Sequence, residues 1–295
     1  MRRNSGLTLI ETLIALFIFG IVATIATTGV VNALRVQATN EAAASAQAKL
    51  RRITEVFTQE LRSAVLGGVT NHPYTSGTTQ ISFVLLDGGA GYQVLPHDSG
   101  NNNSFVNSTN VQILAAAPLS QVRAELDDSE VLMVNANGDA VILNITNVTE
   151  RGSGKNTFNL VHPACDNTID FTTNTLIMKV RSIGITLGAD GSLYQRDGVG
   201  AEIPLAFDLD GLRLDYVYQQ ADGTPHVLSE PETEGGVPVR DSTIGGRPVT
   251  LARVQMTVSA SEPSVGGRMV ERSYTGQVEM ATNRSFQIKR VVPCD

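Results

Sequence analysis

Residues 6–31 read GLTLIETLIALFIFGIVATIATTGVV, and Glu11 is the one charged residue among them. The run from Thr12 to Val31 carries no charge at all. An α-helix rises about 1.5 Å per residue, so about 20 residues cross the roughly 30 Å hydrocarbon core of a bilayer. The stretch therefore predicts a membrane-crossing helix near the start of the sequence.

A short basic leader, MRRNS, precedes Gly6. Arginines ahead of an apolar helix hold that end in the cytoplasm and direct the rest of the chain across the membrane. An ordinary secretory signal has a shorter apolar region followed directly by a small-residue cleavage site. Here the A-x-A sequences lie at 44–48, well past the apolar run. A plain anchor fits the length but gives no reason for Glu11, because an ionised group is costly in a membrane.

Residues 6–11, GLTLIE, resemble the type III signal of type IV pilins and of the related secretion pseudopilins. In that family a prepilin peptidase cuts after the glycine on the cytoplasmic face and methylates the new first residue. The resemblance implies a cleaved leader of residues 1–6, a cut between Gly6 and Leu7, and N-methylation of Leu7. It also implies that Glu11 acts in filament assembly by pairing with the α-amine of a neighbouring subunit, since buried charges need partners.

The helical pattern continues beyond the apolar run. From Glu41 to Leu66 the sequence is rich in Ala, Gln, Glu and Arg and contains neither Pro nor Gly. Apolar residues recur there at steps of three and four, as on one face of an α-helix. Arg51 and Glu55 are spaced to form an ion pair on the opposite side. The apolar stripe, which we expect to pack on the protein's own sheet, consists of Leu50, Ile53, Phe57, Leu61 and Val65.

These patterns predict one long helix over residues 7–66. Its first part, 7–34, would cross the membrane and form the filament core, and its second part, 35–66, would be amphipathic. The pair Gly67-Gly68 is expected to end the helix, because glycine commonly follows a helix C-terminus.

After Gly68 the sequence changes to short β-rich runs separated by turn residues, which predicts a β-rich globular headgroup over 67–295. Tight turns are expected at 137–139 and 190–191. The segments 87–110 and 221–248 lack apolar periodicity and read as long surface loops. The fold class is α+β, with the long helix packed on an antiparallel β-sheet. The predicted strands are 80–86, 111–117, 131–135, 140–148, 157–161, 176–187, 193–196, 212–219, 251–259 and 274–281.

Strand patterns in the C-terminal half are similar to those of PilW-type minor pilins and their J-type secretion counterparts. A headgroup of this size is large for a major pilin, which favours a subunit used in few copies. The resemblance implies a single-pass inner-membrane protein with its headgroup outside the cytoplasm, later at the pilus or cell surface. Its implied partners are the prepilin peptidase, other major and minor pilins and the inner-membrane assembly platform. The similar runs are 59–64, 203–206, 211–218, 251–258 and 276–283.

Catalytic and metal-binding patterns are not found in the sequence. The four histidines are isolated, with no HExxH motif and no nucleophile elbow. Cys165 and Cys294 lie too far apart for a zinc knuckle or a CxxC motif. We therefore predict no enzyme, no cofactor and no metal. The resemblance places the headgroup in an oxidising compartment, where Cys165 and Cys294 would form a disulfide. Two unpaired thiols are the alternative.

The predicted function is that of a minor pilin built through its N-terminal helix into a type IV pilus. It would support pilus assembly, twitching motility, adhesion and DNA uptake. The alternatives are a minor pseudopilin of type II secretion, or an adhesin or DNA receptor displayed on the pilus. The formal net charge of −7 disfavours general nucleic-acid binding, which needs Lys and Arg opposite phosphates. DNA binding would need a local patch, either Arg51, Arg52 and Arg62 or Arg284, Lys289 and Arg290.

Overall fold

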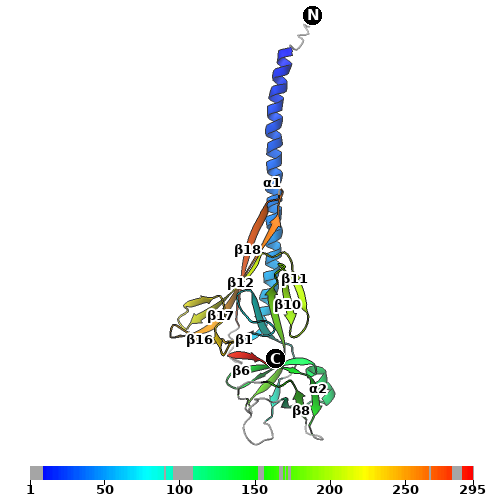
Figure 1. Cartoon of the computed structure of the whole chain (residues 1–295), viewed down its shortest axis with the longest axis vertical. Coiled ribbons are helices and arrows are strands. Elements are labelled where there is room, and N and C mark those ends of the chain that lie inside the picture. The colour runs from blue at the N-terminus through cyan, green and yellow to red at the C-terminus, as the bar shows by residue number, and fades with distance from the viewer. Residues whose placement is uncertain are drawn as a thin grey trace.

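The protein consists of one long helix that rises from a β-rich head (Figure 1). The computed structural model describes residues 9–89, 91–95, 109–151, 156–165, 169, 171, 174–265, 267–280 and 288–294, without the side chains of 65–67. The predicted leader and the predicted cut between Gly6 and Leu7 lie outside the described residues. The α+β class and the packing of the helix on antiparallel sheets are confirmed.

The helix α1 spans Leu9–Arg62, which is 54 residues and about 80 Å. Its C-terminal end is earlier than the predicted residue 66. The backbone N–H of Ser63 donates to the carbonyls of Gln59 and Glu60, and the chain then enters β1 (Ala64–Thr70).

This early end follows from strand pairing. β1 pairs with β2 (Gln80–Leu86), so that Ala64 lies opposite Leu85 and Val69 opposite Phe83, with an irregularity between them. The Gly67-Gly68 pair falls in that irregularity rather than at the helix terminus. Helix preference is a weak local tendency, and here the pairing of the flanking residues outweighs it.

The largest sheet has twelve strands, and β9 (Leu176–Leu187) runs through its centre. The first half of β9 pairs with β3 (Tyr92–Val94) and β5 (Ser129–Val134). Its second half pairs with β2 and with β10 (Leu193–Asp197). The pairings are antiparallel except that β19 runs parallel to β6. The other strands are β4 (Asn110–Leu114), β6 (Asp139–Ile145), β7 (Asn147–Glu150), β8 (Thr157–Val161), β11 (Glu202–Ala206) and β19 (Arg290–Pro293).

A second sheet of five strands lies along α1. It has the order β13-β12-β17-β16, and β18 (Met269–Glu279) pairs with the same edge of β17 (Arg247–Pro263) as β16, farther along the strand. The prediction of a loop over 221–248 is wrong, because four short strands lie there. The remaining strands are β12 (Gly211–Gln220), β13 (Pro225–Leu228), β14 (Thr233–Glu234), β15 (Val237–Pro238) and β16 (Asp241–Ile244).

Tyr218 on β12 holds part of the segment 221–248 in place through two hydrogen bonds. Its hydroxyl donates to the carbonyl of Val239 at 2.9 Å and accepts from the backbone N–H of Glu232 at 3.0 Å. The side chain is fully buried, and burial raises the pKa of its hydroxyl. A buried hydroxyl with both a donor and an acceptor partner holds two chain segments in place, which turn signals alone do not reveal.

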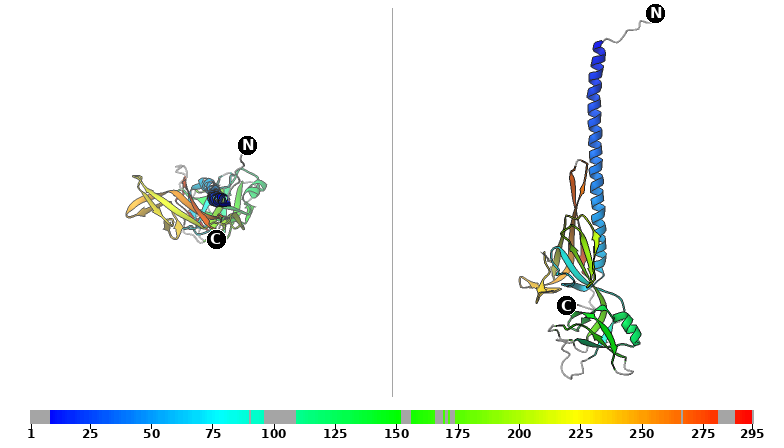
Figure 2. Two further views of the ribbon diagram at one scale, coloured as in Figure 1. Left: turned by 90° about the horizontal axis from the view of Figure 1, so that it is seen from above. Right: turned by 45° about the vertical axis from the view of Figure 1, so that its right-hand side comes forward.

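The head has two regions joined by β9 (Figure 2). One apolar core unites α1 with β1, β2, β12, β17 and β18, beside the lower half of the helix. A second core lies beyond the end of α1 and unites β3 to β8 with α2 (Leu119–Leu126). Ile183 and Ile185 of β9 belong to the first core and Ile177 to the second.

The predicted strands 80–86, 157–161 and 176–187 match β2, β8 and β9 residue for residue. The turns between β5 and β6 and between β9 and β10 are also confirmed, with Gly138 at φ 86° and Gly191 at φ 75°. The run 140–148 is divided into β6 and β7. Within the predicted loop 87–110, β3 occupies three residues, and 96–108 lie outside the described part.

Candidate functional site: the exposed helix and its junction with the head

The N-terminal half of α1 stands clear of the head (Figure 1). Large apolar side chains project from it on all sides, and Phe17 and Phe19 are 71% and 70% exposed. In the described part of the chain, α1 is a helix long and apolar enough to cross a membrane. Apolar surface of this extent marks contact with lipid or with other proteins.

The threonine hydroxyls in the described part of the apolar segment form hydrogen bonds within the helix. Thr24 donates to the carbonyl of Gly20 at 2.8 Å, and Thr27 donates to that of Ala23 at 2.6 Å. Thr12 and Thr28 make equivalent bonds one turn back along the helix. Because these hydroxyls are satisfied within the helix, the segment is compatible with a bilayer interior.

Glu11 lies in the first turn of α1, at the end farthest from the head. A carboxylate is favoured there because the partial positive charge of a helix N-terminus attracts it. Gly6 and Leu7, the predicted cleavage and methylation positions, lie outside the described residues.

The lower half of α1 packs on the head through one buried stripe. Four of the five predicted members, Leu50, Ile53, Phe57 and Leu61, are buried there, together with Ala46. The fifth, Val65, belongs to β1 rather than to the helix. Burying each large apolar side chain contributes about 1.5–3 kcal/mol, so the stripe fastens the helix to the head.

Helix and sheet approach each other closely at Gly276 of β18. A Cβ atom at this position would overlap the Cγ2 methyl of Thr54, which is itself buried on α1. The hydroxyl of Thr54 points back along the helix and donates to the carbonyl of Leu50 at 2.9 Å. The sequence offers one weak signal for this contact, a glycine inside a strand pattern, which often marks a close backbone approach.

Charged side chains flank the apolar contact. Lys49 Nζ lies 3.7 Å from Glu262 Oε1 on β17 and donates to the carbonyl of Asp208 at 3.2 Å. The predicted pair of Arg51 and Glu55 is confirmed, with Arg51 Nε 2.8 Å from Glu55 Oε1. This hydrogen bond raises the pKa of Arg51. The second pair is exposed, so it adds little to stability.

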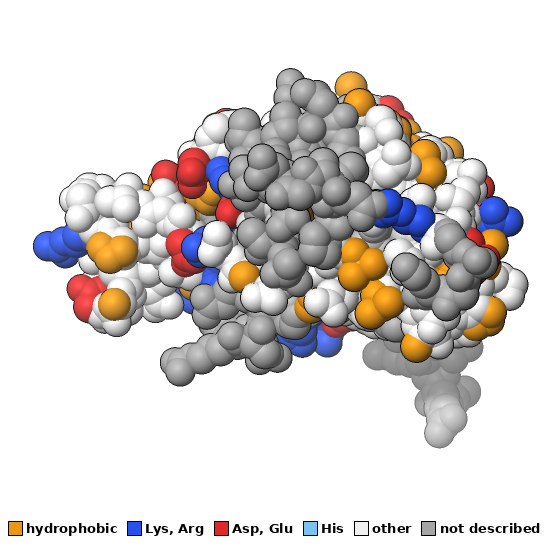
Figure 3. All heavy atoms as spheres, turned by 90° about the horizontal axis from the view of Figure 1, so that it is seen from below, with side chains coloured by type: hydrophobic (Ala, Val, Ile, Leu, Met, Phe, Trp, Pro, Cys, Tyr) orange, Lys and Arg blue, Asp and Glu red, His pale blue; other side chains and the backbone are white. Residues whose placement is uncertain are grey.

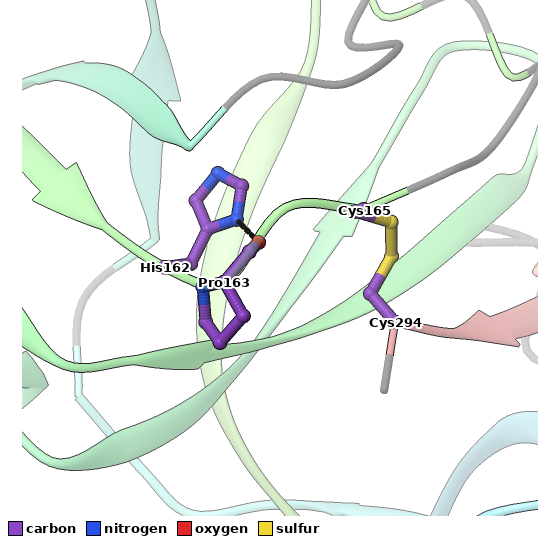
Figure 4. The surroundings of a disulfide bond; sticks show 4 residues. All are labelled: His162, Pro163, Cys165 and Cys294. Atoms are coloured by element: carbon purple, nitrogen blue, oxygen red, sulfur yellow. Dashed lines mark hydrogen bonds between the residues drawn. A yellow bond between two sulfur atoms is a disulfide. The ribbon is translucent and has the colours of Figure 1, made fainter.

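The C-terminus is tied to the distal region by a disulfide between Cys165 and Cys294, as predicted (Figure 4). Their Cα atoms are 5.1 Å apart, although the residues are separated by 129 positions in the chain. The parallel pairing of β19 with β6 and the bond from Cys294 N–H to the carbonyl of Ile142 hold the same segment.

His162 lies beside this disulfide (Figure 4). Its Nδ1–H donates to the carbonyl of Pro163 at 2.6 Å. The ring is almost fully buried, and this burial lowers the pKa of His162, although the bond to Pro163 opposes the shift. The side chain is therefore a neutral core histidine.

In the proposed basic patch at the C-terminus, Arg290 is paired, whereas Lys289 is exposed. Arg290 lies between two carboxylates, with Nε 2.8 Å from Asp139 Oδ1 and Nη1 3.3 Å from Glu234 Oε1. Arg284 lies outside the described residues. On the distal face, the described Lys and Arg side chains are scattered rather than gathered (Figure 3). Among the described residues, no group of three or more His, Cys, Asp or Glu could hold a metal ion.

Comparisons with known proteins bear on the N-terminus. A family model described as "Prokaryotic N-terminal methylation motif" matches residues 1–27. No curated protein matches the chain. Among solved structures, a match titled "Crystal structure of group B streptococcus pilus 2b backbone protein" has 13% sequence identity, covers 77% of this chain and 95% of that chain, and has a TM-score of 0.13. A likeness this weak carries no argument about fold or function.

The methylation motif and the fold agree with each other. The described part of the motif, residues 9–27, forms the start of an apolar helix that is exposed at its N-terminal half and buried against antiparallel sheets at its C-terminal half. The chain therefore carries a prokaryotic N-terminal methylation motif on an α+β, pilin-like fold.

Proposed function

We propose that this protein is a minor pilin, cut after Gly6, methylated at Leu7 and built through α1 into a type IV pilus. The observation that carries the proposal is the methylation motif at the tip of a helix whose apolar N-terminal half is exposed. Before assembly this surface would be covered by the inner membrane, and in the filament by the helices of neighbouring subunits.

The division of α1 into two halves supports this role. The buried stripe fastens the lower half to the head, so a pull on the exposed half is transmitted to the head. The disulfide adds a covalent tie at the far end of the chain. A subunit that leaves a membrane and enters a filament needs an apolar helix that can exchange lipid for neighbouring subunits. It also needs a head that stays folded during this transfer.

The size of the head supports use in few copies, as in a minor pilin of the PilW type. It would then support pilus assembly and pilus-dependent motility, adhesion or DNA uptake. A minor pseudopilin of type II secretion has the same stem and sheet, so it remains the alternative. Detection of the mature protein in sheared pili would favour the minor pilin. Loss of protein secretion when its gene is deleted would favour the pseudopilin of type II secretion.

The experiment that tests the assembly role is the substitution Glu11→Ala in the native host, with Glu11→Asp as the matched control. We expect the Glu11→Ala precursor to be cut and methylated normally, because the peptidase acts before assembly. Its amount in sheared filaments should fall strongly, because the α-amine of the neighbouring subunit loses its partner, whereas Glu11→Asp should retain part of it. Normal incorporation of Glu11→Ala would refute the pairing role.

A further inference from the structure

The hairpin formed by β17 and β18 runs along α1 toward the exposed apolar half of the helix (Figures 1 and 2). Two polar contacts join its outer part to the helix. Thr39 Oγ1 and Ser264 Oγ are 3.1 Å apart, and Lys49 pairs with Glu262. The turn closes on itself, because Ser264 N–H donates to the carbonyl of Arg268 at 2.8 Å. We call residues 264, 265 and 267–269 the hairpin tip.

The hairpin tip is level with the end of the apolar surface of α1. Val36 is 60% exposed and lies three residues before Thr39, which corresponds to about 5 Å along the helix axis. Val265 follows Ser264 in the turn beyond the end of β17, so the hairpin tip lies within about one helical turn of Val36 along the helix axis. A lipid headgroup layer that reaches Val36 would therefore come close to the tip.

The side chains of the tip suit a membrane surface. Val265 and Met269 are 59% and 56% exposed. Arg268 is exposed beside them, and Arg35 of α1 lies at the same level. Of the nearby acids, Glu262 is paired with Lys49, whereas Glu41, which accepts a bond from Gln37 at 2.9 Å, and Glu271 are exposed. Exposed apolar residues next to cations are the composition that binds an anionic lipid surface.

We propose that the hairpin tip docks into the headgroup layer of an anionic phospholipid bilayer while the protein waits in the membrane. This proposal rests on the membrane-crossing role of α1. Docking would give the head a second attachment to the membrane beside the helix, so that the head is held in one orientation. On entry into a filament the tip would be released from lipid.

The sequence contains no tryptophan, so one introduced indole reports on one position. The full chain carrying Val265→Trp would be reconstituted into phosphatidylglycerol-containing vesicles whose acyl chains are brominated, and into neutral phosphatidylcholine vesicles of the same kind. The matched control is Val227→Trp on β13, where the replaced side chain is 58% exposed on the five-stranded sheet and away from the membrane. Flotation of the vesicles first tests that α1 has inserted.

We expect the Val265→Trp variant to show blue-shifted emission that brominated lipid quenches, more strongly in anionic than in neutral vesicles. The control should show neither effect. Adding Arg268→Glu should lower the ratio of docked to undocked tips at least about fivefold in anionic vesicles, because losing one cation near such a surface accounts for about 1 kcal/mol and the new carboxylate is also repelled.

Three results would overturn the proposal, each with flotation intact. Equal acrylamide access in the Val265→Trp and Val227→Trp variants would show that the tip stays in water. Protection from acrylamide without quenching by brominated lipid would show that a second copy of the chain covers it. Equal quenching in both vesicle types, unchanged by Arg268→Glu, would overturn the assignment to an anionic surface. A failure of flotation would instead count against the membrane-crossing role of α1.

Discussion

The contact between Gly276 and Thr54 predicts that the interface between α1 and the head tolerates little added side-chain volume at this point. In the Gly276→Ala variant, the added methyl group would overlap Thr54 Cγ2, while the other neighbouring atoms of Thr54 and Thr58 stay at 3.6 Å. Overpacking of a tight contact costs about 1–3 kcal/mol. For a protein of this size, a loss of about 2 kcal/mol lowers the Tm by about 4–8 °C.

A double-mutant cycle tests that reasoning, with the Tm of the full chain in detergent as the readout. Thr54→Ser removes the overlapping methyl but keeps the hydroxyl that bonds to Leu50, so alone it should cost only about 0.8 kcal/mol. In the double variant the new alanine methyl fills that space, and the Tm should return close to the parent value. Gly77→Ala, where an added Cβ meets open space, is the control. Additive losses in the double variant, or no loss in Gly276→Ala, would refute the close fit.

Two further predictions concern the distal region. Replacing Cys165 and Cys294 by Ser should lower the free energy of unfolding by up to about 5 kcal/mol, because the unfolded chain loses its loop constraint. The parent protein treated with reductant should show the same fall in Tm. An unchanged Tm would contradict the structural role of the bond. Burial lowers the pKa of His162, so the unfolded state takes up a proton first as the pH falls through about 6.5, and stability is lost below that pH. The Tm should therefore drop between pH 7 and pH 5, and His162→Gln should reduce the drop; an equal drop in this variant would assign the effect to other groups.

The sequence could predict the features that depend on local periodicity. The stripe from Leu50 to Leu61 identified the packing face of α1, because steps of three and four residues place side chains on one side of a helix. Long runs such as 176–187 predicted β9 to the residue, because its alternation extends over many positions. The methylation motif was recognisable because its residues are contiguous.

Features that depend on partners distant in the chain could not be predicted in the same way. The helix ends at Arg62 because Ala64 pairs with Leu85, and nothing local to residues 63–66 shows this. The segment 221–248 reads as a loop, yet pairing with β12 and β17 and the bonds of Tyr218 order it. The eight-residue helix α2 follows Pro118 and has no side-chain cap, so its signal was weak.

The intact mass of the mature protein from its native host tests most directly whether the chain is a processed pilin-like subunit. The mass should correspond to residues 7–295 with one added methyl group on Leu7 and one closed disulfide. Loss of that methyl group and of processing in a host lacking its prepilin peptidase would assign both steps to this enzyme. A mature protein that still carries Met1 and the leader would contradict the account.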